Sequence, residues 1–364
     1  MRVVVADDAI LFRRVMEQVL NSLPGVEVVG LAPNGKLALQ RVQELKPDLL
    51  TLDMEMPEMD GLAVLDALKG MPGAPAVIVV SALTLHGGRL TLQALQKGAF
   101  DFITKPDEAG AEKSRESLTN ELTPRIKALS LRLGVRGILR GAAPAPAASL
   151  PPTIPAAHTA PARGGVPVSL KPEMVLIGVS TGGPNTLASL LPALPPTLGV
   201  PILIVQHMPP LFTQSLAENL GGKCSMKVRE AVHGELAEPN TVYIAPGGRH
   251  MRIAAGPDGR KMIQITDDPL ENNCRPAVDY LFRSAATQFP GRALAVILTG
   301  MGGDGTLGLR LLKRHGCHVI AQDEASSVVW GMPKAAAEAG VVDVVLPLDA
   351  IAGKIASLVR GGVP

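Results

Sequence analysis

A segment dominated by alanine and proline divides the chain into two parts. It runs from residue 141 to 168 and reads GAAPAPAASLPPTIPAAHTAPARGGVPV. Each proline fixes φ and removes a backbone donor, so this stretch favours an extended, semi-rigid spacer over packed structure. A chain of 364 residues is long enough for two or three domains. We therefore predict a first domain at 1–125, a helix end and linker at 126–170, and a second domain at 171–364.

Composition and charge exclude several classes of protein. A hydrophobic fraction of 46% and a charged fraction of 19% are typical of a soluble globular chain. The formal net charge of +2 and the aromatic content of 2% give no basic footprint or stacking platform, so we expect no nucleic-acid partner. Three cysteines without a CxxC pair, no signal peptide and no long apolar window predict a cytoplasmic protein.

Short apolar runs alternate with amphipathic helical stretches in both parts of the chain. The expected strands of the first part are 2–6, 26–30, 48–53, 76–82 and 99–104. Those of the second part are 174–180, 201–207, 293–300 and 317–323, and residues 241–265 read as hairpins with GG and PDG turns. Strands that alternate with helices predict parallel sheets covered on both faces. The expected fold class is therefore α/β, with two doubly wound domains.

Five polar side chains follow four of the expected strands of the first part, where parallel strands share one edge. They are Asp7, Asp8, Asp53, Ser81 and Lys105. Any one of them alone could be a solvated loop residue, but the set favours a site. Carboxylates that converge repel one another unless a hard cation such as Mg²⁺ lies among them. A lysine and a hydroxyl beside that ion could hold the oxygens of a phosphoryl group on Asp53.

The motifs VVADDA, LLTLDMEMPEMDGL, VVSA and TKP make the first 125 residues resemble the receiver domain of two-component response regulators. The resemblance implies a flavodoxin-like fold with Asp53 as the phospho-acceptor. It implies a Mg²⁺ site made by Asp8 directly, Asp7 beside it, Asp53 and the backbone carbonyl of Glu55. Ser81 and Lys105 would be switch residues. Phe102 falls at the position of the family's switch aromatic, although an ordinary core phenylalanine is an equally open interpretation.

The second part contains GVSTGGP at the end of an apolar strand, which places Ser180 on a turn into a helix. Such a serine could be a nucleophile, or only a helix N-cap. A nucleophilic serine needs a base. His207 ends the next expected strand and is favoured as that base, with His250 in APGGRHM as its competitor.

The loop LTGMGGDGTLG, residues 298–308, places Asp304 among glycines that let backbone N–H groups approach a ligand. Asp304 could orient the histidine, cap the following helix, or do both. The chain order serine, histidine, aspartate differs from the serine, acid, histidine order of α/β-hydrolases. We therefore expect a Rossmann-like sheet that carries its own triad.

Five segments, GVSTGGP, VQHMP, YIAPGGRHM, RPAVDYLF and TGMGGDG, resemble the catalytic domain of chemotaxis response-regulator protein-glutamate methylesterases. The resemblance implies that Ser180 is the nucleophile, His207 the general base and acid, and Asp304 the group that orients His207. The Met301 N–H would stabilise the oxyanion, with Thr181 as a weaker candidate. Cys274 stands where many relatives are expected to carry histidine. We expect it to be a loop or core thiol, because the sequence pairs no base with it.

This resemblance implies phosphorylation-activated hydrolysis of glutamate γ-methyl esters on methyl-accepting chemoreceptors, with release of methanol, in chemotactic adaptation. It also implies deamidation of receptor glutamines, a chemotaxis histidine kinase as phosphodonor, Mg²⁺ in the receiver domain and no cofactor in the catalytic domain. The protein would meet the membrane only through receptors. Two alternatives stay open, namely a phosphorylation-controlled binding module without hydrolysis and an esterase for small molecules.

Overall fold

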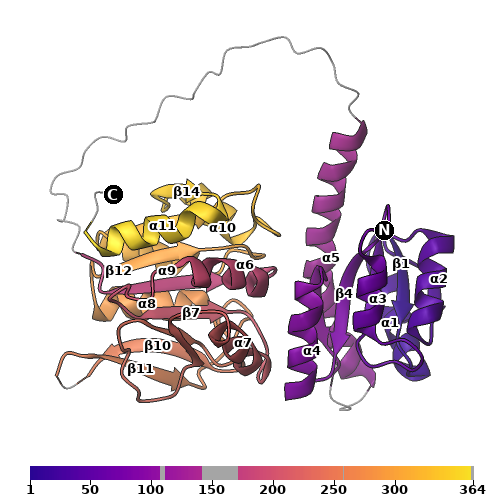
Figure 1. Ribbon diagram of the computed structural model, residues 1–364, viewed down its shortest axis with the longest axis horizontal. Helices are drawn as coiled ribbons and strands as arrows, with labels where there is room; N and C mark the ends of the chain where they lie inside the picture. The colour runs from indigo at the N-terminus through magenta and orange to yellow at the C-terminus, as the bar shows by residue number, and fades with distance from the viewer. Residues whose placement is uncertain (107–110, 142–170, 257, 362–364) are drawn as a thin grey trace, which may run out of the picture.

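The computed structural model describes residues 1–106, 111–141, 171–256 and 258–361. The predicted linker lies almost entirely outside these residues. The described part forms two α/β bodies, each built on a parallel sheet (Figure 1). The predicted fold class is therefore confirmed.

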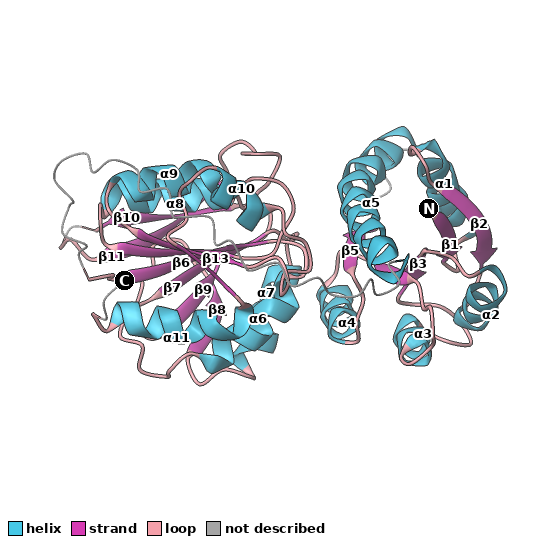
Figure 2. Ribbon diagram, turned by 90° about the horizontal axis from the view of Figure 1, so that it is seen from above, coloured by secondary structure: helices cyan, strands magenta, loops and turns pink. Residues whose placement is uncertain are grey.

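The first body has five parallel strands in the order β2-β1-β3-β4-β5. Their bounds are β1 Arg2–Ala6, β2 Glu27–Ala32, β3 Leu49–Asp53, β4 Ala76–Ser81 and β5 Asp101–Thr104. The helices are α1 Ile10–Ser22, α2 Gly35–Leu45, α3 Gly61–Leu68, α4 Leu85–Gln96 and α5 Ala111–Gly141. Figure 2 shows α1 and α5 on one face of the sheet and the other three helices on the opposite face. Burial of both faces explains the nearly continuous apolar strands.

The second body has seven parallel strands in the order β14-β13-β12-β6-β7-β9-β8. Their bounds are β6 Met174–Val179, β7 Ile202–Gln206, β8 Lys227–Glu230, β9 Thr241–Ile244, β12 Ala293–Ile297, β13 His318–Gln322 and β14 Val344–Leu346. One face carries α8 Val278–Gln288, α9 Thr306–Arg314 and α10 Met332–Glu338 (Figure 2). The other carries α6 Gly183–Leu190, the 3₁₀ helix η1 Leu191–Ala193, α7 Phe212–Gly221 and α11 Leu348–Val359.

The prediction of hairpins at 241–265 is right for one part of that segment and wrong for another. β10 His250–Ala255 and β11 Lys261–Thr266 form an antiparallel pair, as expected. β9 instead joins the parallel sheet between β7 and β8. All four residues of β9 are buried, and a strand buried on both faces lacks the alternation that distinguishes an exposed hairpin. The short edge strands β8 and β14 were not predicted.

The two bodies touch through α4 and α7. Arg89 pairs with Glu218 at 3.1 Å across this contact. Gly88 on α4 lies so close to α7 that an added Cβ would come within 2.8 Å of the Ser215 hydroxyl. A glycine here therefore lets the two helices approach closely.

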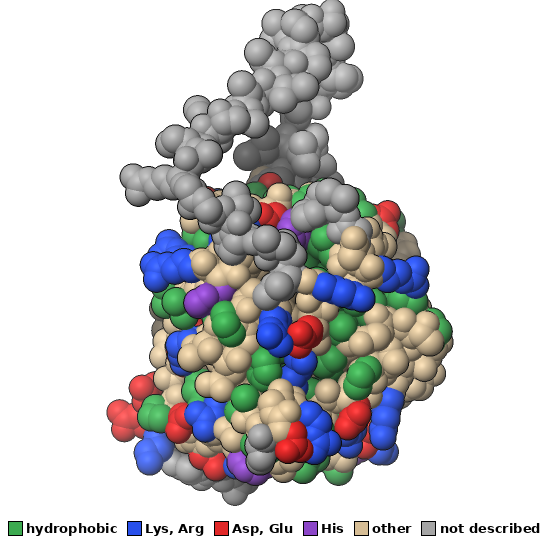
Figure 3. Space-filling view, turned by 90° about the vertical axis from the view of Figure 1, so that its left-hand side faces the viewer, with side chains coloured by type: hydrophobic (Ala, Val, Ile, Leu, Met, Phe, Trp, Pro, Cys, Tyr) green, Lys and Arg blue, Asp and Glu red, His purple; other side chains and the backbone are tan. Residues whose placement is uncertain are grey.

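Positive and negative side chains are interspersed on the face of the molecule shown in Figure 3, so neither sign gathers into a large patch there. Among the described helices, none has both the length and the apolar character needed to cross a bilayer.

Candidate active site

Two adjacent strands of the second sheet bring Ser180 and His207 to the same edge. β6 and β7 are paired in parallel with Val179 opposite Gln206, and Ser180 and His207 are the next residues of each strand. The His207 N–H donates to the Val179 carbonyl at 3.1 Å, which continues the pairing by one step. The buried Gln206 amide donates to the carbonyls of Ser180 at 2.9 Å and of His207 at 3.3 Å. Gln206 therefore fixes both backbones, a role that the sequence analysis missed.

Asp304 holds the His207 ring. The His207 Nε2 atom lies 2.8 Å from Asp304 Oδ2, and only 14% of the histidine side chain and 4% of the aspartate side chain are exposed. Burial lowers the pKa of His207, but the hydrogen bonds to Asp304 and Cys274 outweigh it and raise that pKa above 6.5. Burial likewise raises the pKa of Asp304, yet its bond with His207 and backbone donors bring it below 3.8. A carboxylate bonded to one ring nitrogen fixes the tautomer and leaves the lone pair of the other nitrogen, Nδ1, free to accept a proton.

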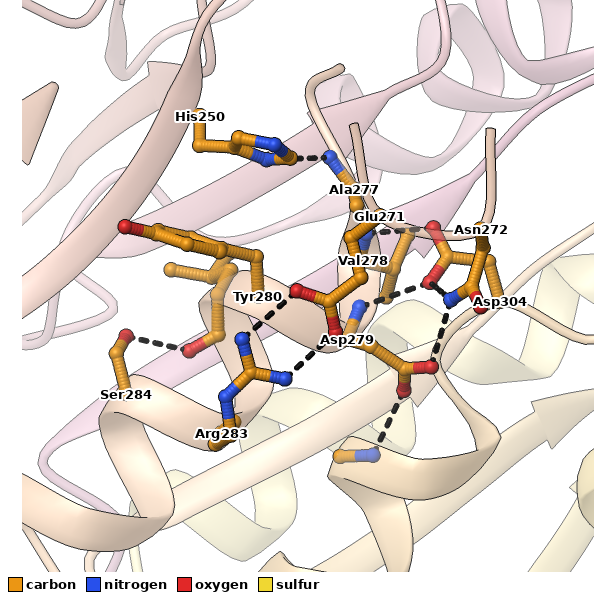
Figure 4. Close-up of polar contacts among 12 residues, drawn as sticks. His250, Glu271, Asn272, Ala277, Val278, Asp279, Tyr280, Arg283, Ser284 and Asp304 are labelled. Carbon is orange, nitrogen blue, oxygen red and sulfur yellow. Dashed lines mark hydrogen bonds and ion pairs between the residues drawn. The ribbon is translucent and has the colours of Figure 1, made fainter. Parts of the chain in front are cut away.

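The carboxylate of Asp304 caps a helix other than its own. The backbone N–H groups of Val278 and Asp279, in the first turn of α8, donate to it at 2.7 and 3.0 Å (Figure 4). The positive end of the α8 dipole favours the charged form of this carboxylate. The alternative interpretation, that Asp304 caps α9, is not met, because Gly305 is the N-cap of α9 and makes no side-chain cap bond. Asp304 therefore gains its low pKa from α8 as well as from the histidine.

A second aspartate and an asparagine complete this network. Asp279 on α8 accepts from the Gly308 N–H in the first turn of α9 at 2.7 Å, so a side chain of α8 binds the N-terminus of α9. The Asn272 side-chain amide donates to Asp279 at 2.9 Å and to Asp304 at 2.8 Å, as Figure 4 shows. Asn272 thus separates two carboxylates that would otherwise repel. Neither residue was predicted from the sequence, although RPAVDYLF contains Asp279.

The glycine-rich loop passes directly beside the serine. A Cβ on Gly300 would lie 2.7 Å from the Ser180 Cβ, so only glycine fits there. The backbone N–H groups of Met301 and Thr181 donate to no acceptor within the described part of the chain. These two predicted donors flank Ser180 and are free to bind a developing oxyanion.

The structure corrects the expectation that no base pairs with Cys274. Its Sγ lies 3.9 Å from His207 Nδ1, the nitrogen that Asp304 leaves free. The Ser180 hydroxyl makes no hydrogen bond to any described residue. Catalytic hydrogen bonds in substrate-free enzymes are often long or unformed and tighten in the complex.

His250 does not compete for the role of base. Its ring is fully buried and stacks on Tyr280 with centroids 4.4 Å apart. Nε2 bonds the Pro269 carbonyl at 3.0 Å, and Nδ1 accepts from the Ala277 N–H at 3.3 Å (Figure 4). Both ring nitrogens are therefore used to hold the loop before α8.

The polar groups predicted for the first body also meet at one sheet edge. Carboxylate oxygens of Asp7, Asp8 and Asp53 lie within 4.8 Å of one another. The Lys105 Nζ bonds Asp53 at 2.7 Å and Asp7 at 2.8 Å. Burial first, and then the charge of Asp7, raises the pKa of Asp53 to about 6. This edge therefore carries crowded negative charge that one lysine does not fully neutralise.

The remaining predicted residues of this edge are close by. The Glu55 N–H donates to Asp53 at 3.4 Å, which puts the Glu55 backbone beside that carboxylate. Ser81 is buried and donates to the Gly87 carbonyl at 3.1 Å. Phe102 is 5% exposed and stacks on Phe212 of the second body, with centroids 5.2 Å apart.

A hydrogen bond between the two bodies involves Thr181, the residue that follows Ser180. The buried Thr181 hydroxyl donates to Asp101 at 3.0 Å, and Asp101 pairs with Arg125 of α5 at 3.2 Å. Asp101 and Phe102 are the first two residues of β5, whereas Lys105 follows its last residue. Asp101 was not predicted from the sequence, because an acidic residue at the start of a strand resembles any solvated residue.

Comparison with known proteins agrees with this arrangement. Residues 3–112 match the family described as response regulator receiver domain, and residues 175–355 match the family described as CheB methylesterase. A protein-glutamate methylesterase/protein-glutamine glutaminase of Desulfotalea psychrophila is 49% identical over 99% of both chains. A protein of the same description from Nocardioides is 44% identical over 95% of this chain and 92% of its own. The crystal structure of the Thermotoga maritima CheB methylesterase catalytic domain, 44% identical, covers 51% of this chain and 98% of its own with a TM-score of 0.50. The chain therefore belongs to the family of protein-glutamate methylesterases/protein-glutamine glutaminases that carry a receiver domain.

Proposed function

We propose that this protein hydrolyses glutamate γ-methyl esters on methyl-accepting chemoreceptors under the control of phosphorylation at Asp53. The observation that carries the proposal is the meeting of Ser180 with the His207–Asp304 pair at one sheet edge, in a chain that also holds a receiver domain. We assign the receiver to residues 1–125 and the catalytic domain to 171–364. The protein would work in the cytoplasm and reach the membrane only through its receptors.

Each proton transfer and each bond change of the proposed reaction can be assigned to a named group. His207 Nδ1 takes the Ser180 proton while Oγ attacks the ester carbonyl, and Asp304 stabilises the imidazolium that forms. The Met301 and Thr181 N–H groups bind the oxyanion. Collapse breaks the bond to the methoxy group, and His207 returns the proton so that methanol leaves. Water then attacks the acyl enzyme by the same route and restores Ser180 and a free carboxylate. General-base assistance is worth about 10²–10⁴-fold in rate and an oxyanion donor about 10²–10³-fold.

The same acyl transfer would deamidate receptor glutamines, with ammonia as the leaving group in place of methanol. An amide is a poorer acyl donor than an ester, so His207 must protonate its nitrogen before the bond breaks. The imidazolium that forms when His207 takes the Ser180 proton is the acid for that step.

The receiver residues fit a hard divalent cation. Three carboxylates share one edge there, and a single lysine, Lys105, pairs with two of them, Asp7 and Asp53. Asp8, Asp7, Asp53 and the Glu55 carbonyl would hold Mg²⁺, which supplies charge neutralisation for phosphoryl transfer to Asp53. A chemotaxis histidine kinase would be the phosphodonor. Lys105 and Ser81 would bind the phosphoryl oxygens, so both must leave their present partners, Asp7 and Gly87.

The contacts between the bodies support control by occlusion. Asp101 of the receiver holds the hydroxyl of Thr181, which adjoins Ser180 and supplies one of the oxyanion donors. Phosphorylation puts a phosphoryl group of about −1.5 to −2 charge in place of the Asp53 carboxylate and draws on Lys105 and Ser81. Ser81 ends β4 and Lys105 follows the last residue of β5, so a shift of Lys105 would reach the Asp101 and Phe102 contacts on β5.

Methanol released from methylated chemoreceptor membranes tests the proposal. We expect release that rises with acetyl phosphate and is lost in Ser180→Ala, with normal folding of that variant. Release from the Ser180→Ala protein would refute the triad. No release by folded wild-type protein would favour the binding-module alternative, whereas release from small esters but not receptors would favour the small-molecule esterase.

A further inference from the structure

Cys274 lies against the one nitrogen of the catalytic histidine that no other group holds. Its Sγ is 3.9 Å from His207 Nδ1, which is long for a hydrogen bond from a thiol. Asp304 occupies the opposite nitrogen, Nε2, at 2.8 Å. The thiol and imidazole therefore face each other with only a long, weak hydrogen bond between them.

The distance between Sγ and Nδ1 is close to the distance between two donor atoms that bind the same metal ion. Zinc lies about 2.3 Å from a thiolate sulfur and about 2.0–2.1 Å from an imidazole nitrogen, so a tetrahedral angle separates the two donors by roughly 3.5 Å. The observed 3.9 Å exceeds this by about 0.4 Å, a difference that a small side-chain rotation removes. Thiolate and imidazole select zinc-like ions over Mg²⁺ and Ca²⁺.

The surroundings match those of a ligating histidine. Such a residue almost always donates its second ring N–H to a carboxylate, as His207 does to Asp304. The oxygens of Asp304 already accept further hydrogen bonds, from Val278, Asp279, Asn272 and Gly305. We therefore expect Asp304 to support the ligand His207 and not to bind the metal itself. Its charge and that of Asp279 favour a bound cation. The Arg275 guanidinium points away, towards the carbonyls of residues 267 and 268.

The turn that carries Cys274 is held in place. Glu271 and Cys274 exchange two backbone hydrogen bonds, at 3.1 and 2.8 Å. Asn272 and Asn273 between them both have positive φ, at 53° and 57°, a conformation that asparagine tolerates better than most residues. A ligand on such a fixed turn loses little conformational freedom on binding.

We propose that Cys274 Sγ and His207 Nδ1 form an inhibitory site for a thiophilic divalent cation such as Zn²⁺, with water in its remaining positions. The thiol releases its proton when the sulfur–metal bond forms. The cation takes the lone pair that would otherwise accept the Ser180 proton, so the loaded enzyme is inactive. The inhibition rests on the proposed role of His207, whereas the binding site does not.

Binding is tested on the full-length protein with Co²⁺ as the probe and excess Mg²⁺ to fill the receiver carboxylates. A thiolate ligand gives cobalt a charge-transfer absorption in the near ultraviolet. We expect this band in the wild type and in the control Cys224→Ser, which removes a partly exposed thiol elsewhere, and its loss in Cys274→Ser. Zn²⁺ should displace Co²⁺ and abolish the band. Absence of the band from the wild type, or its survival in Cys274→Ser, would overturn the site.

Inhibition is tested by methanol release, with each variant compared with its own metal-free rate. Zn²⁺ should inhibit the wild type and Cys224→Ser, EDTA should restore the rate, and Cys274→Ser should need at least tenfold more Zn²⁺. Equal sensitivity of Cys274→Ser, or inhibition that EDTA does not reverse, would overturn the inhibitory role. If no methanol is released in metal-free buffer, only the proposed function is contradicted, because the cobalt absorption tests the metal site independently of activity.

Discussion

Replacing Asn272 by aspartate tests whether this amide keeps two carboxylates apart. Its nitrogen lies 2.9 Å from Asp279 and 2.8 Å from Asp304. A third carboxylate at those distances would meet a repulsion of about 6 kcal/mol from each neighbour at an effective dielectric constant of about 20. The site would take up a proton instead. Protonating a carboxyl costs about 1.4 kcal/mol for each pH unit above its ordinary pKa of about 3.9, which amounts to about 5–6 kcal/mol at pH 8 and about 1.5 kcal/mol at pH 5.

The expected loss of unfolding free energy in Asn272→Asp therefore grows with pH, by about 4 kcal/mol between pH 5 and pH 8. The sign follows because the new carboxyl has a raised pKa in the folded state, so its unfavourable effect appears as pH rises. Urea unfolding followed by fluorescence reports on the second body alone, because Trp330 is the chain's single tryptophan. Asn272→Gly is the control, since it accepts the positive φ, removes the amide and adds no charge. A loss in Asn272→Asp that does not change with pH would refute the reasoning.

Three further predictions follow from the two sites. In a pH–kcat/KM profile, activity should rise with pH with a midpoint above pH 6.5, because His207 must be neutral to act as base. Asp304→Asn should lower both that midpoint and the rate. Asp101→Ala should raise methanol release without phosphodonor and reduce the fold-stimulation by acetyl phosphate, because it frees Thr181; an unchanged ratio would argue against occlusion. In Mg²⁺-free buffer at pH 8, Asp53→Asn should stabilise the receiver by up to about 3 kcal/mol, since its pKa is raised to about 6, and thermal unfolding should show the gain vanish below about pH 4.

The candidate site residues that directly follow strands could be placed together from the sequence. Parallel strands end at a common edge, so Asp53, Lys105, Ser180 and His207 could be placed together from the apolar runs before them. Asp304 could be placed because its glycine-rich loop follows β12. These residues share one property, which is that a short stretch of regular backbone fixes their position.

Asn272 and Cys274 could not be predicted in this way. They lie on a turn between the β10–β11 hairpin and α8, and their contacts with Asp304 and His207 depend on how that turn folds back over the sheet edge. Neither hydrophobic periodicity nor secondary-structure propensity determines the path of such a turn. Asp101 was missed for a related reason, since its partner Thr181 belongs to the other body and local sequence carries no sign of a contact 80 residues away.

The position of β5 explains how one phosphorylation site could control a distant serine. Asp101 and Phe102 at the start of this strand contact Thr181 and Phe212 of the second body, and Lys105 follows its last residue. Three residues of extended chain span about 10 Å, so both ends belong to one short, rigid element. A movement of Lys105 from Asp7 and Asp53 towards a phosphoryl group would pull on the strand that holds the occluding contacts. Packed interfaces have few stable arrangements. Even a small shift of this strand would therefore favour loss of the contact between the two bodies over a gradual change in it. Under the proposed control the receiver would need no separate relay, since the proposed switch lysine directly follows the strand that contacts the second body.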